Sequence, residues 1–155
     1  RNVLVASLVG KGIGLLIIFM TPFENIGIVI FGHVLFTIPG FGFPSTLSMV
    51  ADSIDYQDLK TGVRSDGVAY AFYGLATKVG NAFGGSIGVM LMAAFGYAAG
   101  ADITASAQHG INMAANLVPG IFFIIAGLLP LIFWKMTDKE ADEIREQITA
   151  RNMAE

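Results

Sequence analysis

Long charge-free stretches constrain this chain more than any other feature of its sequence. No Asp, Glu, Lys or Arg lies between Glu24 and Asp52, between Lys78 and Asp102, or between Asp102 and Lys135. Each gap can hold about 20 apolar residues, the length that a helix needs to cross about 30 Å of hydrocarbon. The composition agrees, because 54% of the 155 residues are apolar and only 14% are charged. The sequence therefore predicts an all-α membrane protein rather than a soluble helical core.

The apolar stretches predict four membrane-spanning helices followed by a tail. We place these helices at about residues 3–20, 26–50, 67–96 and 111–134, within a transmembrane part of residues 1–135. Prolines and glycines at residues 38–44 predict a kink or an unwound turn in the second span. Pro119 and Pro130 predict further kinks in the fourth. Residues 136–155 are expected to form a cytoplasmic amphipathic tail.

The distribution of basic residues predicts the orientation. The amino end, the loop 51–66 and the tail carry Lys and Arg, whereas the connections 21–25 and 97–110 carry none. The positive-inside rule then puts both ends and the middle loop in the cytoplasm. We expect a multi-pass protein of the cell inner (plasma) membrane. Because the chain starts at Arg1 with an apolar span and no signal-peptide pattern, we also expect it to be a piece of a longer protein.

Composition and motifs argue against several other classes of protein. The net charge is −3 and no basic patch is present, so nucleic acid is not an expected partner. The absence of cysteine excludes disulfides and thiolate metal sites. No phosphate loop, nucleophile elbow or metal-ligand spacing is apparent. We therefore expect no catalytic residue, no metal and no enzymatic activity.

A lysine inside the third span points most directly to a function. At about 100° per residue, it shares about one third of the helix circumference with other polar or small residues. The residues on this side are Tyr70, Gly74, Thr77, Lys78 and Asn81. Lys78 lies about 17 Å into the span, near the midplane where transporters place substrates and coupling ions. Such a face can line a path for a hydroxylated solute, although a structural lysine that is paired or snorkels outward is the alternative.

The polar segment before this span contains both signs of charge. Asp52, Asp55 and Asp58 are spaced by three, and Lys60 and Arg64 follow. Carboxylates with cations beside them at the membrane edge predict a salt-bridge cluster that opens and closes. The residues of this expected cytoplasmic gate are Asp52, Asp55, Tyr56, Lys60 and Arg64. A solvated loop is the alternative for Asp52 and Asp55.

Other polar and small residues have more ordinary interpretations. Gly80, Gly84 and Gly88 are spaced by four and predict a close helix-packing seam. Lys11 either lines the same interior as Lys78 or marks a span whose register is misplaced. His33 is expected to be a hydrogen-bonded packing residue.

Two features near the ends of the last span complete the sequence-based description. His109 falls in an outer connection and is expected to have no specific role. Thr137-Asp-Lys-Glu140 is a capping-box pattern that starts a helix. We expect this helix to lie against the cytoplasmic face as a solvated end with no specific task.

Residues 51–67 carry a family resemblance. Their sequence, Ala-Asp-Ser-Ile-Asp-Tyr-Gln-Asp-Leu-Lys-Thr-Gly-Val-Arg-Ser-Asp-Gly, closely resembles the last cytoplasmic inter-helix loop of the glycoside–pentoside–hexuronide:cation symporters. These are the melibiose-permease-like branch of the major facilitator superfamily, with the approximate pattern A-D-x-x-D-Y-x-x-x-K-T-G-x-R-x-E-G. The stretches Lys78-Val-Gly-Asn-Ala-Phe-Gly-Gly85 and Trp134-Lys-Met-Thr-Asp-Lys-Glu140 are similar to the following family segments. Asp66 stands where Glu is usual, and the resemblance covers about residues 45–150.

The resemblance implies a fold and a function. The family fold is two six-helix bundles around a central cavity, and this chain would be helices nine to twelve. It would be the C-terminal part of a secondary active transporter that couples symport of a sugar or glycoside to a cation by alternating access. Lys78 would lie by the sugar and cation sites, and Asp52, Asp55 and Arg64 would lock the cytoplasmic side.

The same resemblance implies that the missing N-terminal half is the main partner. That half would hold the coupling cation (Na⁺, H⁺ or Li⁺) and most sugar contacts, and no other cofactor is expected. Three alternatives remain open from the sequence. They are a related symporter of lysolipids, an intramembrane enzyme, and a freestanding four-helix scaffold in the bilayer.

Overall fold

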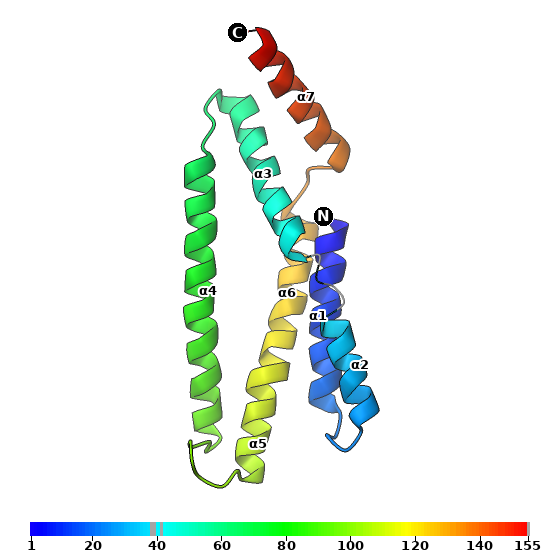
Figure 1. Cartoon of the computed structure of the whole chain (residues 1–155), viewed down its shortest axis with the longest axis vertical. Helices are drawn as coiled ribbons and strands as arrows, with labels where there is room; N and C mark the ends of the chain where they lie inside the picture. Colours follow the sequence, from blue (N-terminus) through cyan, green and yellow to red (C-terminus); the bar gives the residue numbers. More distant parts are fainter. Residues whose placement is uncertain (38–39, 41, 155) are drawn as a thin grey trace.

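The computed structural model describes residues 1–37, 40 and 42–154, and every regular element in that part of the chain is helical (Figure 1). The elements are α1 (Asn2–Met20), α2 (Ile26–Thr37), α3 (Gly42–Thr61), α4 (Asp66–Ala94), α5 (Ala105–Asn112), the π-helical turn Met113–Leu117, α6 (Val118–Phe133) and α7 (Asp138–Ala154). The prediction of an all-helical chain is confirmed for these residues.

Within the part of the chain that the structure describes, three stretches are long and apolar enough to cross a membrane. They are Asn2–Met20, Ile26–Thr61 and Ala105–Phe133. The helix α4 has 29 residues but does not belong to this set. Lys78, Asn81 and the glycines of α4 explain the difference, because they lower its hydropathy without shortening the helix.

The structure corrects two boundaries that hydropathy suggested. Helix α3 continues to Thr61, so residues 51–61 are helical and only residues 62–65 connect α3 to α4. Helix α5 already starts at Ala105, so the outer connection is shorter than expected. The expected break at residues 38–44 falls largely on residues 38, 39 and 41, which lie outside the described residues. Pro44 lies in the first turn of α3, where a proline is tolerated.

Glycines let α1 pack closely against two neighbours. A side chain on Gly14 would place its Cβ 2.6 Å from the carbonyl oxygen of Gly32 in α2. A side chain on Gly12 would place its Cβ 2.7 Å from the carbonyl oxygen of Gly120 in α6. Small residues at such positions are how membrane helices bring their backbones together. The helices α1, α2 and α6 therefore form the packed centre of this chain.

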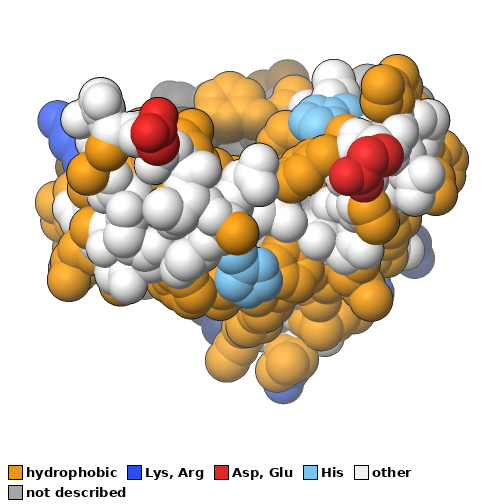
Figure 2. Space-filling view, turned by 90° about the horizontal axis from the view of Figure 1, so that it is seen from below, with side chains coloured by type: hydrophobic (Ala, Val, Ile, Leu, Met, Phe, Trp, Pro, Cys, Tyr) orange, Lys and Arg blue, Asp and Glu red, His pale blue; other side chains and the backbone are white. Residues whose placement is uncertain are grey.

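The ends of the helices divide into two groups. The amino terminus, the connection 62–65 and the carboxyl terminus lie toward one end of the molecule, and Arg1 Nη1 donates to the Trp134 carbonyl oxygen at 3.3 Å (Figure 1). The turns 21–25 and 95–104 lie at the opposite end. Figure 2 views that opposite end, where acidic and histidine side chains sit among apolar and uncharged atoms while Lys and Arg appear only at the rim. This division matches the charge asymmetry from which orientation was predicted.

Helix α4 stands apart from the packed centre (Figure 1). None of its residues is buried, and no atom lies within 4 Å of a side chain built on Gly80, Gly84 or Gly88. The close helix contact predicted for these three glycines is therefore absent among the described residues. At its C-terminal end, α4 stops sharply because Gly96 adopts φ +84° and the Tyr97 amide donates to the Met92 carbonyl oxygen at 3.0 Å.

Candidate functional site

Charged side chains gather at the end of the molecule that holds both termini. Arg64, in the connection 62–65, donates from Nη1 to Asp55 Oδ1 at 2.9 Å and from Nε to Asp66 Oδ2 at 2.8 Å. These hydrogen bonds, to Asp66 first and then to Asp55, raise the pKa of Arg64 above its usual value. Arg64 thus stays charged and joins α3 to the first turn of α4.

The last helix contributes two arginines that the sequence-based gate did not include. Arg145 Nη2 donates to Asp52 Oδ1, and Arg151 Nη2 lies 2.9 Å from each carboxylate oxygen of Asp58. Both pairs join residues that are 93 positions apart, so α3 and α7 run parallel and in register. In the sequence, Asp52 and Asp58 are six residues apart, and so are Arg145 and Arg151. This matching spacing was the signal from which the two ion pairs could have been predicted. It could not show which helices meet.

Apolar contacts accompany these ion pairs. Ile54 and Asp58 of α3 are each only 2% exposed. On α7, the side chains of Ala141, Ile144 and Ile148 are buried. Helix α7 was expected to lie against the cytoplasmic face as a solvated end. It is instead docked on α3 by a buried apolar strip flanked by arginines.

The start of α7 is fixed by reciprocal hydrogen bonds. The Thr137 amide donates to Glu140 Oε2 at 2.7 Å, and the Glu140 amide donates to Thr137 Oγ1 at 3.2 Å. The backbone hydrogen bond from Thr137 is the main cause that lowers the pKa of Glu140. The helix therefore begins at a defined residue, which sets where its arginines meet α3.

Tyr56 and Lys60, two expected gate residues, lie outside the ion-pair cluster. Lys60 Nζ lies 4.5 Å from the centre of the Tyr56 ring. Within the described residues, Lys60 makes no salt bridge to a carboxylate. A cation–π contact at an exposed site contributes about 0.5–1 kcal/mol, so this pair is a minor local contact.

The polar residues predicted to line a path all lie on α4. Lys78, Thr77 and Asn81 are exposed, and Thr77 Oγ1 donates to the Tyr73 carbonyl oxygen at 2.9 Å. Tyr70 is 44% exposed and Gly74 is half-buried. The described part of the chain does not cover this face, so it is open to whatever lies beside α4 in the membrane.

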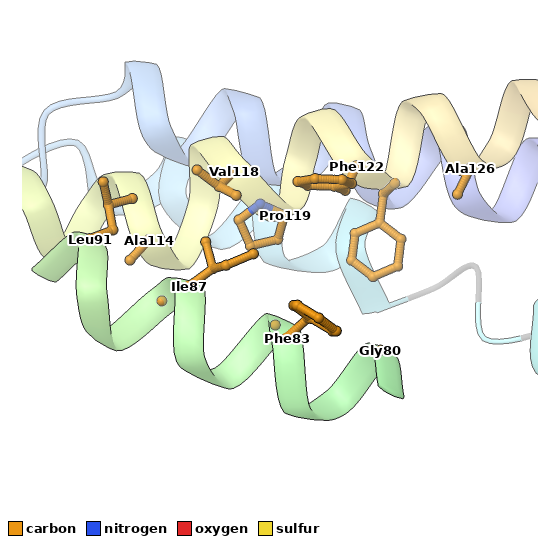
Figure 3. Close-up of a pocket in the computed structure, with 12 residues that line it drawn as sticks. Gly80, Phe83, Ile87, Leu91, Ala114, Val118, Pro119, Phe122 and Ala126 are labelled. Atoms are coloured by element: carbon orange, nitrogen blue, oxygen red, sulfur yellow. The ribbon is translucent and has the colours of Figure 1, made fainter. Parts of the chain in front are cut away.

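A groove of about 510 Å³ separates α4 from α6 (Figure 3). Its lining is apolar or small, with Gly80, Phe83 and Ile87 on one wall and Pro119 and Phe122 on the other. At about 100° per residue, Lys78 lies roughly 150° around the helix axis from the centre of the α4 wall. The groove therefore belongs to the side of α4 that lacks the lysine, and none of the described residues that line it has a polar side chain to bind a sugar hydroxyl.

The two histidines have structural contacts. His33 donates from Nδ1 to the Val29 carbonyl oxygen of its own helix at 2.9 Å, so it is hydrogen-bonded as expected, but the residue is exposed and its packing role stays a prediction. The ring of His109 lies 6.1 Å from the ring of Phe19 and 5.7 Å from that of Phe95. His109 lies in α5 beside the C-terminal ends of α1 and α4, so the expectation that it falls in a loop is wrong. Across the described residues, no cluster of His, Asp and Glu has a geometry that could hold a metal ion.

Comparison with known proteins identifies the family. The family model described as "MFS/sugar transport protein" matches residues 1–138. The chain belongs to this family. The resemblance to glycoside–pentoside–hexuronide symporters, read from residues 51–67, is thereby confirmed at the level of the family.

Curated members of this sugar transport family align with large parts of the chain. A "glucuronide carrier protein homolog" of Escherichia coli is 34% identical over 104 residues, which is 67% of this chain and 22% of that protein. An "isoprimeverose transporter" of Lactiplantibacillus pentosus is 35% identical over 63% of this chain and 20% of that protein. A "putative glycoside/cation symporter" of Escherichia coli is 28% identical over 90% of this chain and 31% of that protein. The chain thus spans between a fifth and a third of the length of these relatives. No solved structure matches it.

Proposed function

We propose that this chain is the C-terminal part of a secondary active transporter that moves a sugar or glycoside together with a cation. The match of the family model across residues 1–138 carries this proposal. Relatives named as a glycoside/cation symporter and as an isoprimeverose transporter support the sugar and the coupling. The rest of the transporter, including its N-terminal half, supplies the remaining helices.

We propose four membrane spans for this part of the transporter. The α4 helix is the fourth, because its 29 residues can cross about 30 Å of hydrocarbon and it runs between the two ends of the molecule. Its lower hydropathy suits a helix whose polar face is covered by protein or water instead of lipid. The end with Arg64, Lys135 and both termini faces the cytoplasm across the inner membrane, and α7 lies there.

The Lys78 face of α4 is our proposed wall of the transport path. No described residue covers it, and an ammonium at this depth needs protein or water around it. The N-terminal half covers this face in the assembled transporter and carries most of the site for Na⁺, H⁺ or Li⁺. Sugar and cation then meet near the midplane, between the two halves.

The ion pairs that Asp52, Asp55 and Asp58 make serve as the cytoplasmic gate in this proposal. They hold the cytoplasmic ends of α3, α4 and α7 together while the path faces outward. Bound sugar and cation favour the inward-facing state, in which these pairs loosen. They can shift the equilibrium between the outward-facing and inward-facing states only by the difference in their affinity for the two. The arginines involved are Arg64, Arg145 and Arg151.

Uptake by the complete transporter tests this function. Lys78→Ala is expected to reduce sugar uptake by about tenfold or more, since one lost charge-assisted hydrogen bond corresponds to at least that factor. The amount of inserted protein stays unchanged, because the Lys78 side chain is exposed in this chain. Leu75→Ala, at another exposed position of α4, is the matched control.

Two results would count against the proposal at different levels. Unchanged uptake and cation dependence in Lys78→Ala would remove this lysine from the path. Failure of the unmodified transporter to take up any sugar or glycoside in membrane vesicles would contradict the function itself.

A further inference from the structure

Lys11 lies on the packed face of α1. The residues Leu4, Ser7, Gly14 and Ile18 are buried, and Lys11 continues their three- and four-residue spacing. On a helix this spacing places all five on one side. Lys11 thus points toward the other helices of the chain, and the register of the first span is sound.

The direction of the Lys11 side chain is fixed by its neighbours in sequence. The backbone of Gly12 approaches α6 and that of Gly14 approaches α2, each so closely that a Cβ would lie within 3 Å of a carbonyl oxygen. Two backbone contacts on different sides prevent α1 from rotating about its axis. Lys11 therefore cannot be turned toward lipid without unpacking both contacts.

The surroundings of the ammonium are aromatic. Lys11 Nζ lies 5.3 Å from the centre of the Phe36 ring and 6.0 Å from that of Phe123. The two rings also contact each other edge to face, with their centres 6.1 Å apart. Phe36 comes from α2 and Phe123 from α6, so three helices meet at this lysine.

The described helices that meet at Lys11 supply no negative charge. Helix α3 also packs on α1, but through Gly42 beside Ser7, and its first aspartate, Asp52, lies ten residues further along and pairs with Arg145. The sequences of α1, α2, the π-helical turn and α6 contain no Asp or Glu. Lys11 is the tenth of the 19 residues of α1, so it lies about 14 Å from either end of the helix. A lysine side chain can extend its ammonium group to the membrane surface mainly from a position near a helix end. Ring faces attract a cation, but they replace only part of the hydration that it loses.

We propose that Lys11 is the cationic half of a carboxylate-binding site, whose anionic half comes from outside this chain. The carboxylate belongs either to a side chain of another membrane-spanning segment of the transporter or to the acid group of a transported sugar. The first source requires only that the chain spans a membrane, and the second rests on the proposed function. In both cases Phe36 and Phe123 hold the ammonium in place.

Thermal unfolding and sugar binding of the complete transporter test this site. The variants are Lys11→Gln and Lys11→Met, which remove the charge, and Lys11→Arg, which keeps it. Lys139→Gln is the control, because the Lys139 side chain is 87% exposed and, among the described residues, its one ion pair is with Glu143 on its own helix. The probes are a glucuronide, which carries a carboxylate, and the corresponding neutral glucoside.

Each source of the carboxylate gives its own result. If a protein side chain supplies it, the uncharged variants unfold at a lower temperature without sugar, and Lys11→Arg does not. Neutralising one intramembrane Asp or Glu then restores the unfolding temperature of Lys11→Gln. If the sugar supplies it, Lys11→Gln weakens glucuronide binding about tenfold or more while binding of the glucoside changes by less than about twofold.

Other results would overturn the site. Lys11→Met and Lys11→Arg with the same unfolding temperature and the same sugar affinities would show that the charge has no counter-ion. A loss of stability that no neutralisation restores would show that the lysine stem only fills space. If the unmodified transporter binds neither sugar, the proposed function is contradicted instead. The unfolding measurements then still show whether Lys11 pairs with a carboxylate of the protein.

Discussion

The pairing of Arg151 with Asp58 predicts how firmly α7 is held. Arg151→Ala removes the nearest cation from a carboxylate whose side chain is 4% exposed, leaving only Arg64 Nη1 at 4.0 Å. Removing one partner of a fully buried pair costs about 3–5 kcal/mol, whereas an exposed pair contributes about 0.2–1 kcal/mol. Because the Arg151 side chain is 37% exposed, we expect an intermediate loss of about 1–2 kcal/mol. That loss lowers the equilibrium constant for docking of α7 by about 5–30-fold.

Hydrogen exchange of the complete transporter in detergent measures this loss. Amides of residues 138–154 should exchange faster in Arg151→Ala by about the same factor, while those of α1 and α6 stay unchanged. Lys139→Ala, an exposed lysine on the same helix, is the control. Asp58→Asn combined with Arg151→Ala should recover part of the protection, because no buried charge is then left without a partner. Equal exchange in Arg151→Ala and Lys139→Ala would refute the reasoning.

Two further predictions concern packing and pH. Gly14→Leu should lower the free energy of unfolding by about 1–3 kcal/mol, because its Cβ meets the Gly32 carbonyl oxygen at 2.6 Å. Gly27→Leu, with no atom within 4 Å, should change it by less than about 0.5 kcal/mol, and equal losses in denaturant titrations would contradict the packing of α1 on α2. The lowered pKa of Glu140 stabilises the start of α7 above the unfolded pKa of about 4.5, and this contribution is lost as pH falls through the lower pKa of the folded state. An NMR titration of the Thr137 amide should show this step and lose it in Glu140→Gln, whereas a step of the same size in that variant would disprove the assignment.

Hydropathy located the apolar helices, but it did not predict how far some of these helices continue beyond their apolar residues. Helix α1 ends at Met20, where Thr21 and Pro22 follow, as the sequence indicates. Helix α3 continues to Thr61 because a helix needs backbone hydrogen bonds, not lipid, and its polar turns are stabilised by partners on α7. A scan for apolar length detects where lipid ends, which is a different property from where the helix ends.

The ion pairs of the candidate site were only partly predictable from the sequence. Asp55 and Arg64 are only nine residues apart and belong to the salt-bridge cluster that local charge spacing predicted, although the spacing did not say which of its members pair. The pairs made by Arg145 and Arg151 depend on which helices become neighbours, and a single sequence carries no such information. The glycine seam of α4 showed the same limit, since spacing indicates that a helix can be approached closely but not by which partner.

The matched spacing between α3 and α7 has a mechanical consequence. Sliding one helix along the other by a single turn, about 5.4 Å, would separate Asp52 from Arg145 and Asp58 from Arg151 at the same moment. Asp55 lies between the two paired aspartates, and Arg145 Nε is already 3.9 Å from its Oδ2. A slide of one turn toward the C-terminal end of α3 would therefore leave Arg145 beside Asp55, while Arg151 would move past Asp58. The tail can therefore keep one ion pair to α3 while it loses the other, so its hold on α3 is released in steps rather than all at once.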